Sequence, residues 1–315
     1  MKAPLITIFH GGISREREVS LESGRALFSA LKERFDVELL DLKEAALPSE
    51  MQPEETIVFP ALHGTFGEDG DLQVLLEERQ IIYAGSDSEA SRLCMDKPRA
   101  KQQVEQVGVT VVPGFEFDAT DSLDAEDVEE KLGQKFVVKP AAEGSSIGLY
   151  HGLDKAALEV LLPRLSDGRW MIEKQVCGRE ITVGVLDGQP LGLVEVLPKG
   201  GVYDFQHKYN SGLTEFRFPA EVTPLLKTKI KENAQKAFVA CGCRDFCRVD
   251  FMVFDDECYF LEINTLPGLT DKSLFPKSAS CYNLNFSELS NRLILPALRR
   301  FQQTNRYAPS PKEKI

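Results

Sequence analysis

The segment DFCRVDFMVFDDECYFLEINTLPG, residues 245–268, carries the strongest indication of fold and site in this chain. Apolar and polar side chains alternate within 246–254, which predicts a β-strand with two unlike faces. An acidic turn follows at 255–257, and residues 258–264 predict a strand that returns antiparallel to the first. The segment therefore predicts a β-hairpin with one apolar face and one face that carries charged side chains.

The charged face of this hairpin brings oxygen ligands together. A three-residue turn centred on Asp256 places Asp250 opposite Glu262 and Arg248 opposite Asn264. Like charges directly opposite each other destabilise a sheet unless another charge compensates them. Two carboxylates and an amide oxygen suit a hard divalent cation, magnesium or manganese. We therefore predict a metal site here rather than the alternative, an exposed charged strand face.

Length and composition limit the class of protein. The chain has 315 residues, of which 43% are hydrophobic and 27% charged, as in an ordinary globular protein of about two or three domains. Its net charge of −12 disfavours broad binding of nucleic acid or anionic membranes, but allows a local basic pocket. No apolar run approaches the roughly 18 residues that a transmembrane helix needs.

The cysteines favour a reducing compartment. There are seven, an odd number in a long chain, which argues for free thiols in a cytosol. Cys241, Cys243, Cys247 and Cys258 lie close enough in sequence to raise the question of a zinc site. Their spacing, with no histidine nearby, is unusual for zinc, so we favour small core residues around a strand.

The first region of the chain predicts an α/β fold. Strand-like apolar runs alternate in it with helical periodicity, at 5–9, 20–34, 57–62 and 81–85. This alternation is typical of a Rossmann-like parallel sheet. Ligands of such sheets bind beyond the carboxyl ends of the strands, so we expect the loops at 10–12 and 63–64 to face a substrate.

The rest of the chain predicts mixed α and β structure. The expected elements are helices at 97–107, 154–165 and 224–240, strands at 135–140, 170–176, 180–187 and 191–197, an acidic loop and helix face at 118–130, and a polar loop at 198–218. The predicted domains are residues 1–94, 95–176 and 177–306, followed by a polar tail at 307–315.

A glycine- and serine-rich loop at 143–148 follows a strand that ends in Lys139. Small residues let backbone N–H groups approach a phosphate, and lysine supplies a point charge for its oxygens. Lys97 is a second candidate, and Glu173 and Glu180 could accept hydrogen bonds from an adenine or a ribose. A flexible surface turn is the alternative. The chain has neither a P-loop nor a dinucleotide fingerprint, which disfavours a dehydrogenase.

Eight motifs together resemble the D-alanine–D-alanine ligases, a family of the ATP-grasp superfamily. They occur in order over nearly the whole chain: HGGISREREVS (10–20), ALHGTFGEDG (61–70), MDKPRAK (95–101), VVKPAAEGSSIG (137–148), IEKQVCGREITV (172–183), YDFQHKY (203–209), CRVDFM (247–252) and LEINTLPGLT (261–270). The resemblance implies a three-domain ATP-grasp fold with ATP between two α+β domains. It also implies two magnesium ions, with manganese possible, a homodimer, and a cytoplasmic role in peptidoglycan precursor synthesis.

The same resemblance implies a role for each candidate site residue. The implied nucleotide residues are Lys97 and Lys139 at the phosphates, Ser146 in the phosphate loop, and Glu173, Lys174, Val176 and Glu180 at the adenine and ribose. The implied metal ligands are Asp250, Glu262 and Asn264. The implied substrate and catalytic residues are Glu16, Val19 and His63 at the first D-alanine, Ser145 and Tyr209 as a hydrogen-bonded pair, Arg248 and the Gly268 N–H at the tetrahedral intermediate, and Lys208 and Ser273 at the second D-alanine.

One feature keeps an alternative open. The motif Thr270-Asp271-Lys272-Ser273 stands where the family usually has T-S-H-S, so Lys272 leaves room for a ligase that joins other small amino acids. A nucleotide-binding regulator without turnover would have lost a metal carboxylate or Arg248, and this chain retains them.

The loop at 198–218 is expected to close over the site and exclude water.

Overall fold

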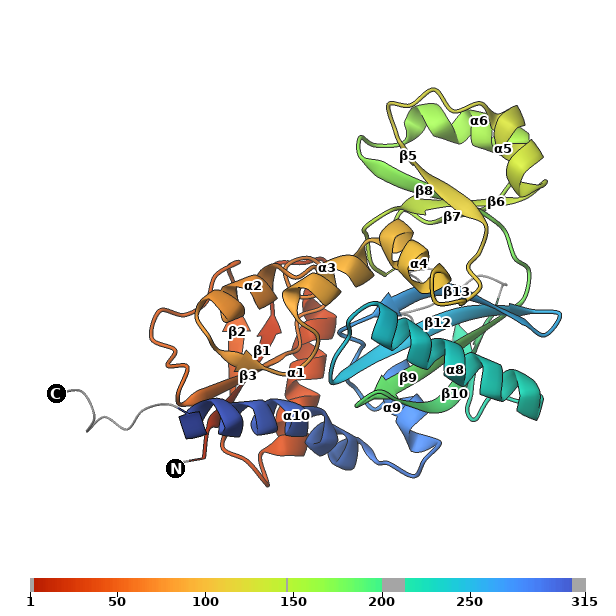
Figure 1. Cartoon of the computed structure of the whole chain (residues 1–315). Helices are drawn as coiled ribbons and strands as arrows, with labels where there is room; N and C mark the ends of the chain where they lie inside the picture. The colour runs from red at the N-terminus through yellow and green to blue at the C-terminus, as the bar shows by residue number, and fades with distance from the viewer. Residues whose placement is uncertain (1–2, 146, 200–212, 308–315) are drawn as a thin grey trace.

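The computed structural model describes residues 3–145, 147–199 and 213–307, and these residues form three sheets with helices packed on them (Figure 1). Ser146, Lys208 and Tyr209 therefore lie outside the described residues, as does most of the expected loop at 198–218. No helix in the described part of the chain combines the length and the apolar character that crossing a membrane requires.

The N-terminal sheet is parallel, as the alternation of strands and helices predicted. Its order is β2-β1-β3-β4, with β1 (Leu5–Gly11), β2 (Val37–Leu42), β3 (Thr56–Pro60) and β4 (Ile82–Tyr83). The helices of this part are α1 (Arg17–Leu31), α2 (Asp71–Glu78) and α3 (Ser88–Met95). Sequence analysis did not predict β2, because this edge strand is only half-buried and mixes polar with apolar residues.

The last helix, α10 (Phe286–Tyr307), returns to the N-terminal sheet and packs against α1, β3 and β4 (Figure 1). Leu289, Leu293 and Ile294 are fully buried there beside Ile6 and Ile8 of β1. The N-terminal core is therefore completed by the far end of the chain.

The central sheet is antiparallel and lies at one end of the molecule (Figure 1). Its order is β5-β8-β6-β7, with β5 (Gly114–Asp118), β6 (Phe136–Pro140), β7 (Tyr150–Leu153) and β8 (Arg169–Lys174). Two helices cover one face of it, α5 (Ala125–Leu132) and α6 (Lys155–Leu161). The acidic segment forms the loop and helix face that were expected, since α5 buries Val128 and Leu132 and exposes Glu126 and Asp127.

The third sheet is antiparallel and holds the hairpin. Its order is β11-β10-β9-β12-β13, with β9 (Arg179–Leu186), β10 (Gln189–Pro198), β11 (Thr214–Arg217), β12 (Phe246–Phe254) and β13 (Glu257–Asn264). Its helices are α4 (Lys97–Glu105), α8 (Pro224–Ala240) and α9 (Leu274–Ser280). Residues 214–217 were expected in the polar loop but form β11, because they pair with the end of β10.

The apolar face of the hairpin forms the core beneath α8 and α4. Cys247, Val249, Phe251 and Val253 lie in this core together with the apolar stripe of α8, as the alternation predicted. Cys241, Cys243 and Cys258 are buried in the same cluster, which confirms their assignment as core residues.

The hairpin has the predicted pairing but a different turn. Asp250 lies opposite Glu262, and Arg248 lies opposite Asn264. The prediction of a three-residue turn is wrong, because Phe254 pairs with Glu257 and only Asp255 and Asp256 form the turn. Both turn residues adopt the left-handed conformation, with φ of 48° and 60°, which two-residue hairpin turns favour. A β-bulge at residue 261 then restores the register that brings the two carboxylates together.

Candidate active site

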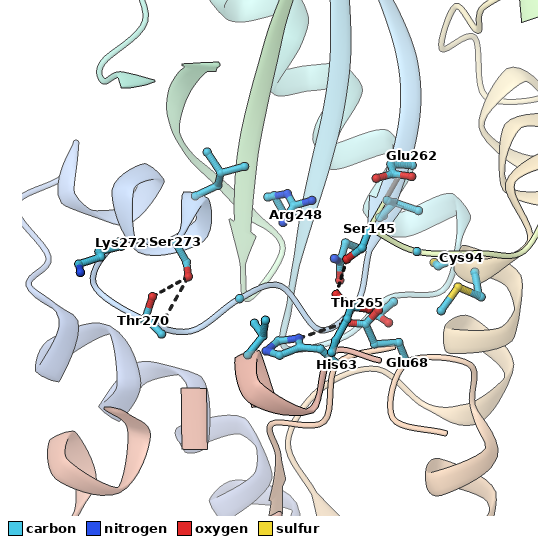
Figure 2. Close-up of a pocket in the computed structure, with 18 of the residues that line it drawn as sticks. His63, Glu68, Cys94, Ser145, Arg248, Glu262, Thr265, Thr270, Lys272 and Ser273 are labelled. Carbon is cyan, nitrogen blue, oxygen red and sulfur yellow. Dashed lines mark hydrogen bonds and ion pairs between the residues drawn. The ribbon is translucent and has the colours of Figure 1, made fainter. Parts of the chain in front are cut away.

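Two adjoining cavities, each of about 600 Å³, lie where the three sheets meet. They share Lys97 and Glu262, which therefore stand at their junction. The first cavity is bounded by the N-terminal and third sheets together with the loop at Gly144 and Ser145, and Figure 2 shows it from close by. The second lies between the central and third sheets.

The predicted site residues divide between these cavities. The first cavity is lined by Glu16, Val19, His63, Ser145, Arg248, Asn264, Gly268 and Ser273. The second is lined by Lys139, Glu173, Lys174, Val176, Glu180 and Asp250. Tertiary structure thus brings the expected substrate residues to one cavity and the expected nucleotide residues to its neighbour.

Asp250 is held in a fixed orientation on the floor between the cavities. Arg248 donates to both of its oxygens, most closely from Nε to Oδ1 at 2.9 Å and from Nη2 to Oδ2 at 2.7 Å. Thr182, which lies opposite Asp250 on the neighbouring strand β9, donates a further hydrogen bond to Oδ1. Asp250 is only 5% exposed, so these donors compensate a buried carboxylate.

The other two candidate metal ligands, Glu262 and Asn264, also have polar partners. Lys97 Nζ lies 3.5 Å from Glu262 Oε2, and Asn264 Oδ1 accepts a hydrogen bond from the Leu266 N–H at 2.9 Å. Within the described ranges no group of three or more His, Cys, Asp or Glu side chains could hold a metal ion. Asp250, Glu262 and Asn264 offer two carboxylates and an amide oxygen, and the cationic Lys97 and Arg248 lie beside them. This donor set fits a hard cation that also binds a polyanionic ligand.

Glu173 lies in a buried ion network at the wall of the second cavity. Its Oε1 forms an ion pair with Lys101, and its Oε2 lies 2.6 Å from Lys139 Nζ. Burial opposes the ionisation of Glu173, but the two lysines outweigh it and hold the pKa of this carboxyl below its usual value. Burial also lowers the pKa of Lys101, to about 8, although Glu173 stabilises its charge. Both oxygens of Glu173 are therefore engaged by lysines.

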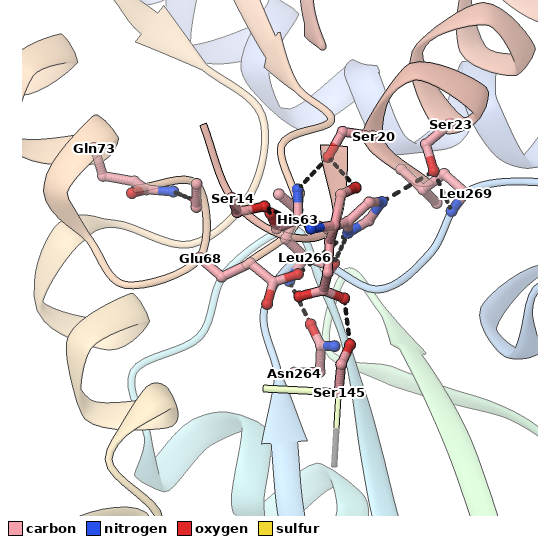
Figure 3. A network of polar contacts seen from close by, with 12 residues as sticks. Ser14, Ser20, Ser23, His63, Glu68, Gln73, Ser145, Asn264, Leu266 and Leu269 are labelled. Carbon is pink, nitrogen blue, oxygen red and sulfur yellow. Dashed lines mark hydrogen bonds and ion pairs between the residues drawn. The ribbon is translucent and has the colours of Figure 1, made fainter. Parts of the chain in front are cut away.

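A second network links three segments around the first cavity (Figure 3). His63 follows the carboxyl end of β3, and its Nε2 lies 2.9 Å from Ser23 Oγ of α1. Its Nδ1 lies 3.2 Å from both Glu68 Oε1 and the Leu266 carbonyl oxygen. The ring of His63 is thereby fixed between the N-terminal sheet and the segment after β13.

Glu16 stands at the start of α1 and is 8% exposed. Ser145, from the glycine- and serine-rich loop, donates a hydrogen bond to Glu16 Oε1. Two segments 129 residues apart therefore meet at this carboxylate. His63 confirms that a loop at the strand ends faces the cavity, whereas His10 packs instead against Gly24 of α1.

Sequence reasoning missed four residues of these networks, of which Ser23 on α1 lies outside every motif given above. Lys101 lies four residues after Lys97 in a quoted motif, but lysine is usually exposed and nothing local indicates its burial. Glu68 also lies in a quoted motif, and burial raises its pKa. Thr182 could have been found only from the pairing of β9 with β12, which no local pattern reveals.

The far end of the first cavity carries the unusual motif. Thr270 Oγ1 lies 2.9 Å from Ser273 Oγ. Lys272 and Lys277 line the same end, and Lys277 Nζ lies 4.8 Å from the centre of the Phe216 ring. This end of the cavity is therefore cationic and suits a carboxylate.

Comparison with known proteins agrees with this geometry. A family model described as the D-ala D-ala ligase C-terminus matches residues 104–295, and its N-terminal counterpart matches residues 41–86. The D-alanine–D-alanine ligase of Syntrophotalea carbinolica is 41% identical over 309 residues, which cover 94% of this chain and 96% of that protein. The ligase of Desulforudis audaxviator is 38% identical, with 94% and 99% covered.

Solved structures of similar proteins have the same fold over the same length. The D-alanine–D-alanine ligase from Bacillus anthracis complexed with ATP superposes with a TM-score of 0.82 at 30% identity, covering 96% of this chain and all of that one. The VanG D-Ala:D-Ser ligase from Enterococcus faecalis superposes with a TM-score of 0.81 at 26% identity, covering 94% of this chain and all of that one.

Proposed function

This chain belongs to the D-alanine–D-alanine ligase family, and we propose that its two adjoining cavities divide the work of the family's reaction. The chain is an ATP-dependent ligase that joins two D-alanines, and its family uses ATP and a divalent metal. In our proposal the second cavity holds ATP, and the first holds the two amino acids. The observation that carries this assignment is the junction, where Lys97 and Glu262 line both cavities beside Arg248 and Asp250.

The first step makes the carboxylate of one D-alanine electrophilic. That carboxylate attacks the γ-phosphorus of ATP, which gives an acyl phosphate and ADP. Glu16 binds the ammonium group of this D-alanine, with Val19 and His63 beside it, and Lys97 and Lys139 bind phosphate oxygens. Two Mg²⁺ ions, held by Asp250, Glu262 and Asn264, would supply Lewis-acid neutralisation of the phosphates. Holding the reactants and compensating their charge are the main contributions a protein makes to phosphoryl transfer.

The second step forms the peptide bond. The amine of the second D-alanine attacks the acyl carbon, and phosphate leaves. Arg248 and the Gly268 N–H stabilise the oxyanion that develops, and removal of one such donor typically slows a reaction about 100- to 1000-fold. Ser273, and Lys208 outside the described residues, bind the second carboxylate. Tyr209 is expected to pair with Ser145, whose contact with Glu16 supports a place close to the first D-alanine.

The proposal is tested by Glu262→Ala with ATP, Mg²⁺ and D-alanine, with the product identified by mass. We expect dipeptide formation to fall at least about 100-fold, because even the outer partners of a metal site typically contribute 10- to 100-fold. Glu257→Gln is the matched control, since Glu257 lies on the same strand but pairs with Lys229 at the surface. Dipeptide formation by Glu262→Ala at the parent rate would refute the assignment.

Several finer features belong to the same proposal. We infer that the metal is Mg²⁺, that the enzyme works in the cytoplasm as a homodimer, and that its domains are residues 1–94, 95–176 and 177–306. Lys272, beside Ser273 in the first cavity, favours one second candidate, a ligase that joins other small amino acids. Phosphate release measured with a panel of D-amino acids distinguishes the two, because D-alanine should be the preferred substrate in our proposal.

A further inference from the structure

Lys101 is a buried cation close to the nucleotide site that lines neither cavity. It lies on α4 four residues after Lys97, so both side chains project from the same face of the helix. Lys97 reaches the junction of the cavities, whereas Lys101 is 4% exposed and points into the protein. A buried lysine is costly unless its charge is compensated, so its contacts indicate a purpose.

The contacts of Lys101 join the central sheet to the third sheet. Its Nζ forms an ion pair with Glu173 of β8 and donates a hydrogen bond of 3.1 Å to the Phe260 carbonyl oxygen of β13. The Phe260 N–H in turn donates to the Thr110 carbonyl oxygen at 2.8 Å, in the segment between α4 and β5. Lys101 is thereby held between Glu173 and β13, away from both cavities.

Glu173 is shared between two lysines that differ in access. Lys139, on the other oxygen of Glu173, lines the second cavity and can reach a ligand there. The three side chains carry two positive charges and one negative charge. If Glu173 had Lys139 as its sole partner, the carboxylate would neutralise the cation that the nucleotide needs. An anchored second cation removes this competition.

We propose that Lys101 is a positioning residue that neutralises Glu173, so that Lys139 keeps its positive charge for the triphosphate of ATP. The inference rests on the assignment of the second cavity to ATP. Lys101 acts through Glu173 and does not touch the nucleotide. The pKa of about 8 that burial imposes on Lys101 leaves it mostly charged at neutral pH, in keeping with this role.

The test is the dissociation constant of ATP, measured by calorimetry with Mg²⁺ present, in Lys101→Met and in Lys101→Met/Glu173→Gln. We expect the single variant to bind ATP about tenfold more weakly, the equivalent of one charge-assisted hydrogen bond. The double variant should recover most of this loss, because it has no carboxylate at position 173 to compete with ATP for Lys139. The KM for D-alanine should change little in either. Lys135→Met, which removes a surface lysine paired with Asp154, is the matched control.

The outcomes separate this inference from the proposed function. Unchanged ATP binding in Lys101→Met, or no recovery in the double variant, overturns the role of Lys101. If Lys101→Met does not fold, the double variant decides alone, since it removes the buried carboxylate together with its cation and leaves only Lys139, which opens to the second cavity. ATP affinity near that of the parent then supports the role, and affinity tenfold weaker overturns it. Lys139→Met should also weaken ATP binding, and an unchanged value there contradicts the assignment of the cavity itself.

Discussion

At the scale of single residues, the site consists of charged side chains whose partners are already in place. Asp250 orients Arg248 by accepting hydrogen bonds at both carboxylate oxygens, and Ser145 orients Glu16 by donating one. A group that is oriented before the substrate arrives costs little reorganisation during the reaction, which makes its electrostatic contribution large. Substitution of these residues should therefore slow catalysis.

Arg248→Met should lower kcat for dipeptide formation about 100- to 1000-fold, the usual cost of losing one donor to a developing oxyanion. The dissociation constant of ATP should change far less, because Arg248 lines the first cavity and not the second. Steady-state kinetics and calorimetry measure the two quantities. Arg244→Met is the control, since Arg244 donates to the Gly85 carbonyl oxygen outside both cavities. A loss of ATP affinity that matches the loss of kcat would argue against a role at the oxyanion.

Ser145→Ala should raise the KM for the first D-alanine about tenfold, because Glu16 loses a charge-assisted hydrogen bond that fixes its carboxylate. Looser binding should also release phosphate from ATP without dipeptide. The ratio of phosphate to dipeptide, measured in one reaction, checks this. Ser287→Ala, on α10 far from both cavities, should leave the ratio at the parent value. An unchanged ratio in Ser145→Ala would contradict the role of this serine.

The affinity for ATP should fall as the pH rises through about 8, the pKa that burial gives to Lys101. Below this pH Lys101 is charged and neutralises Glu173, and above it Lys139 alone faces that carboxylate. The charged groups that face Lys101 are Glu173 from β8, Lys139 from β6 and Glu262 from β13. Calorimetry at several pH values, repeated with Lys101→Met, measures the effect. A parent protein that shows the same pH profile as the variant would exclude Lys101 as its origin.

At the scale of elements, the β12–β13 hairpin carries four residues of the proposed site, Arg248, Asp250, Glu262 and Asn264. With its two-residue turn alone, the hairpin would pair Asp250 with residue 261. The bulge at residue 261 shifts the register by one residue, so that Asp250 lies opposite Glu262. The turn also places two aspartates at positive φ, where a side chain is strained and glycine or asparagine is favoured. The hairpin thus owes its geometry to the bulge rather than to a favourable turn sequence.

Asp255→Asn/Asp256→Gly should raise the free energy of unfolding by about 1 kcal/mol, because Asn-Gly adopts this turn with less strain. Urea denaturation measures the change, and activity should remain at the parent level because the turn lies outside both cavities. Asp255→Asn/Asp256→Ala is the control, since alanine removes the same charges without relieving the backbone. Equal stability of the two variants would show that charge, and not conformation, governs the turn.

At the scale of the whole molecule, one ion pair connects the N-terminal sheet, the third sheet and the last helix. Arg300 of α10 donates from Nη1 and Nη2 to the two oxygens of Asp245, each at 2.7 Å, and from Nη2 to the Tyr83 carbonyl oxygen. Asp245, just before β12, also accepts the Gly85 N–H at 2.9 Å. This cluster fixes the N-terminal sheet against the hairpin, and so fixes the first cavity between them.

Arg300→Met should lower the free energy of unfolding by about 3 kcal/mol, because it leaves the buried carboxylate of Asp245 without its cation. The neighbouring residue offers a matched control. Arg299 pairs with Asp187 at the surface, so Arg299→Met should cost less than about 1 kcal/mol. Urea denaturation of the two variants measures the difference. Similar losses in both would show that the cluster does not hold the sheets together.

Local patterns in the sequence predicted those parts of the protein whose cause is local. The helix at 224–240 has the predicted bounds, because its apolar stripe and its capping residue Thr223 are close in sequence. The face of the hairpin that carries Asp250 and Glu262 was also predictable, because the alternation of a strand has a strict period of two. The parallel sheet of the first region follows likewise from short apolar strands separated by helices.

Only the tertiary structure decided which distant segments meet. The return of α10 to the first sheet, the burial of Lys101 against Glu173 and the contact of Ser145 with Glu16 each join residues far apart in the chain. Such contacts leave no periodic signal, because they depend on how complete elements pack. The residue types of the site were therefore determined by the sequence itself, whereas their division between two cavities that share Lys97 and Glu262 arose from the packing of three sheets.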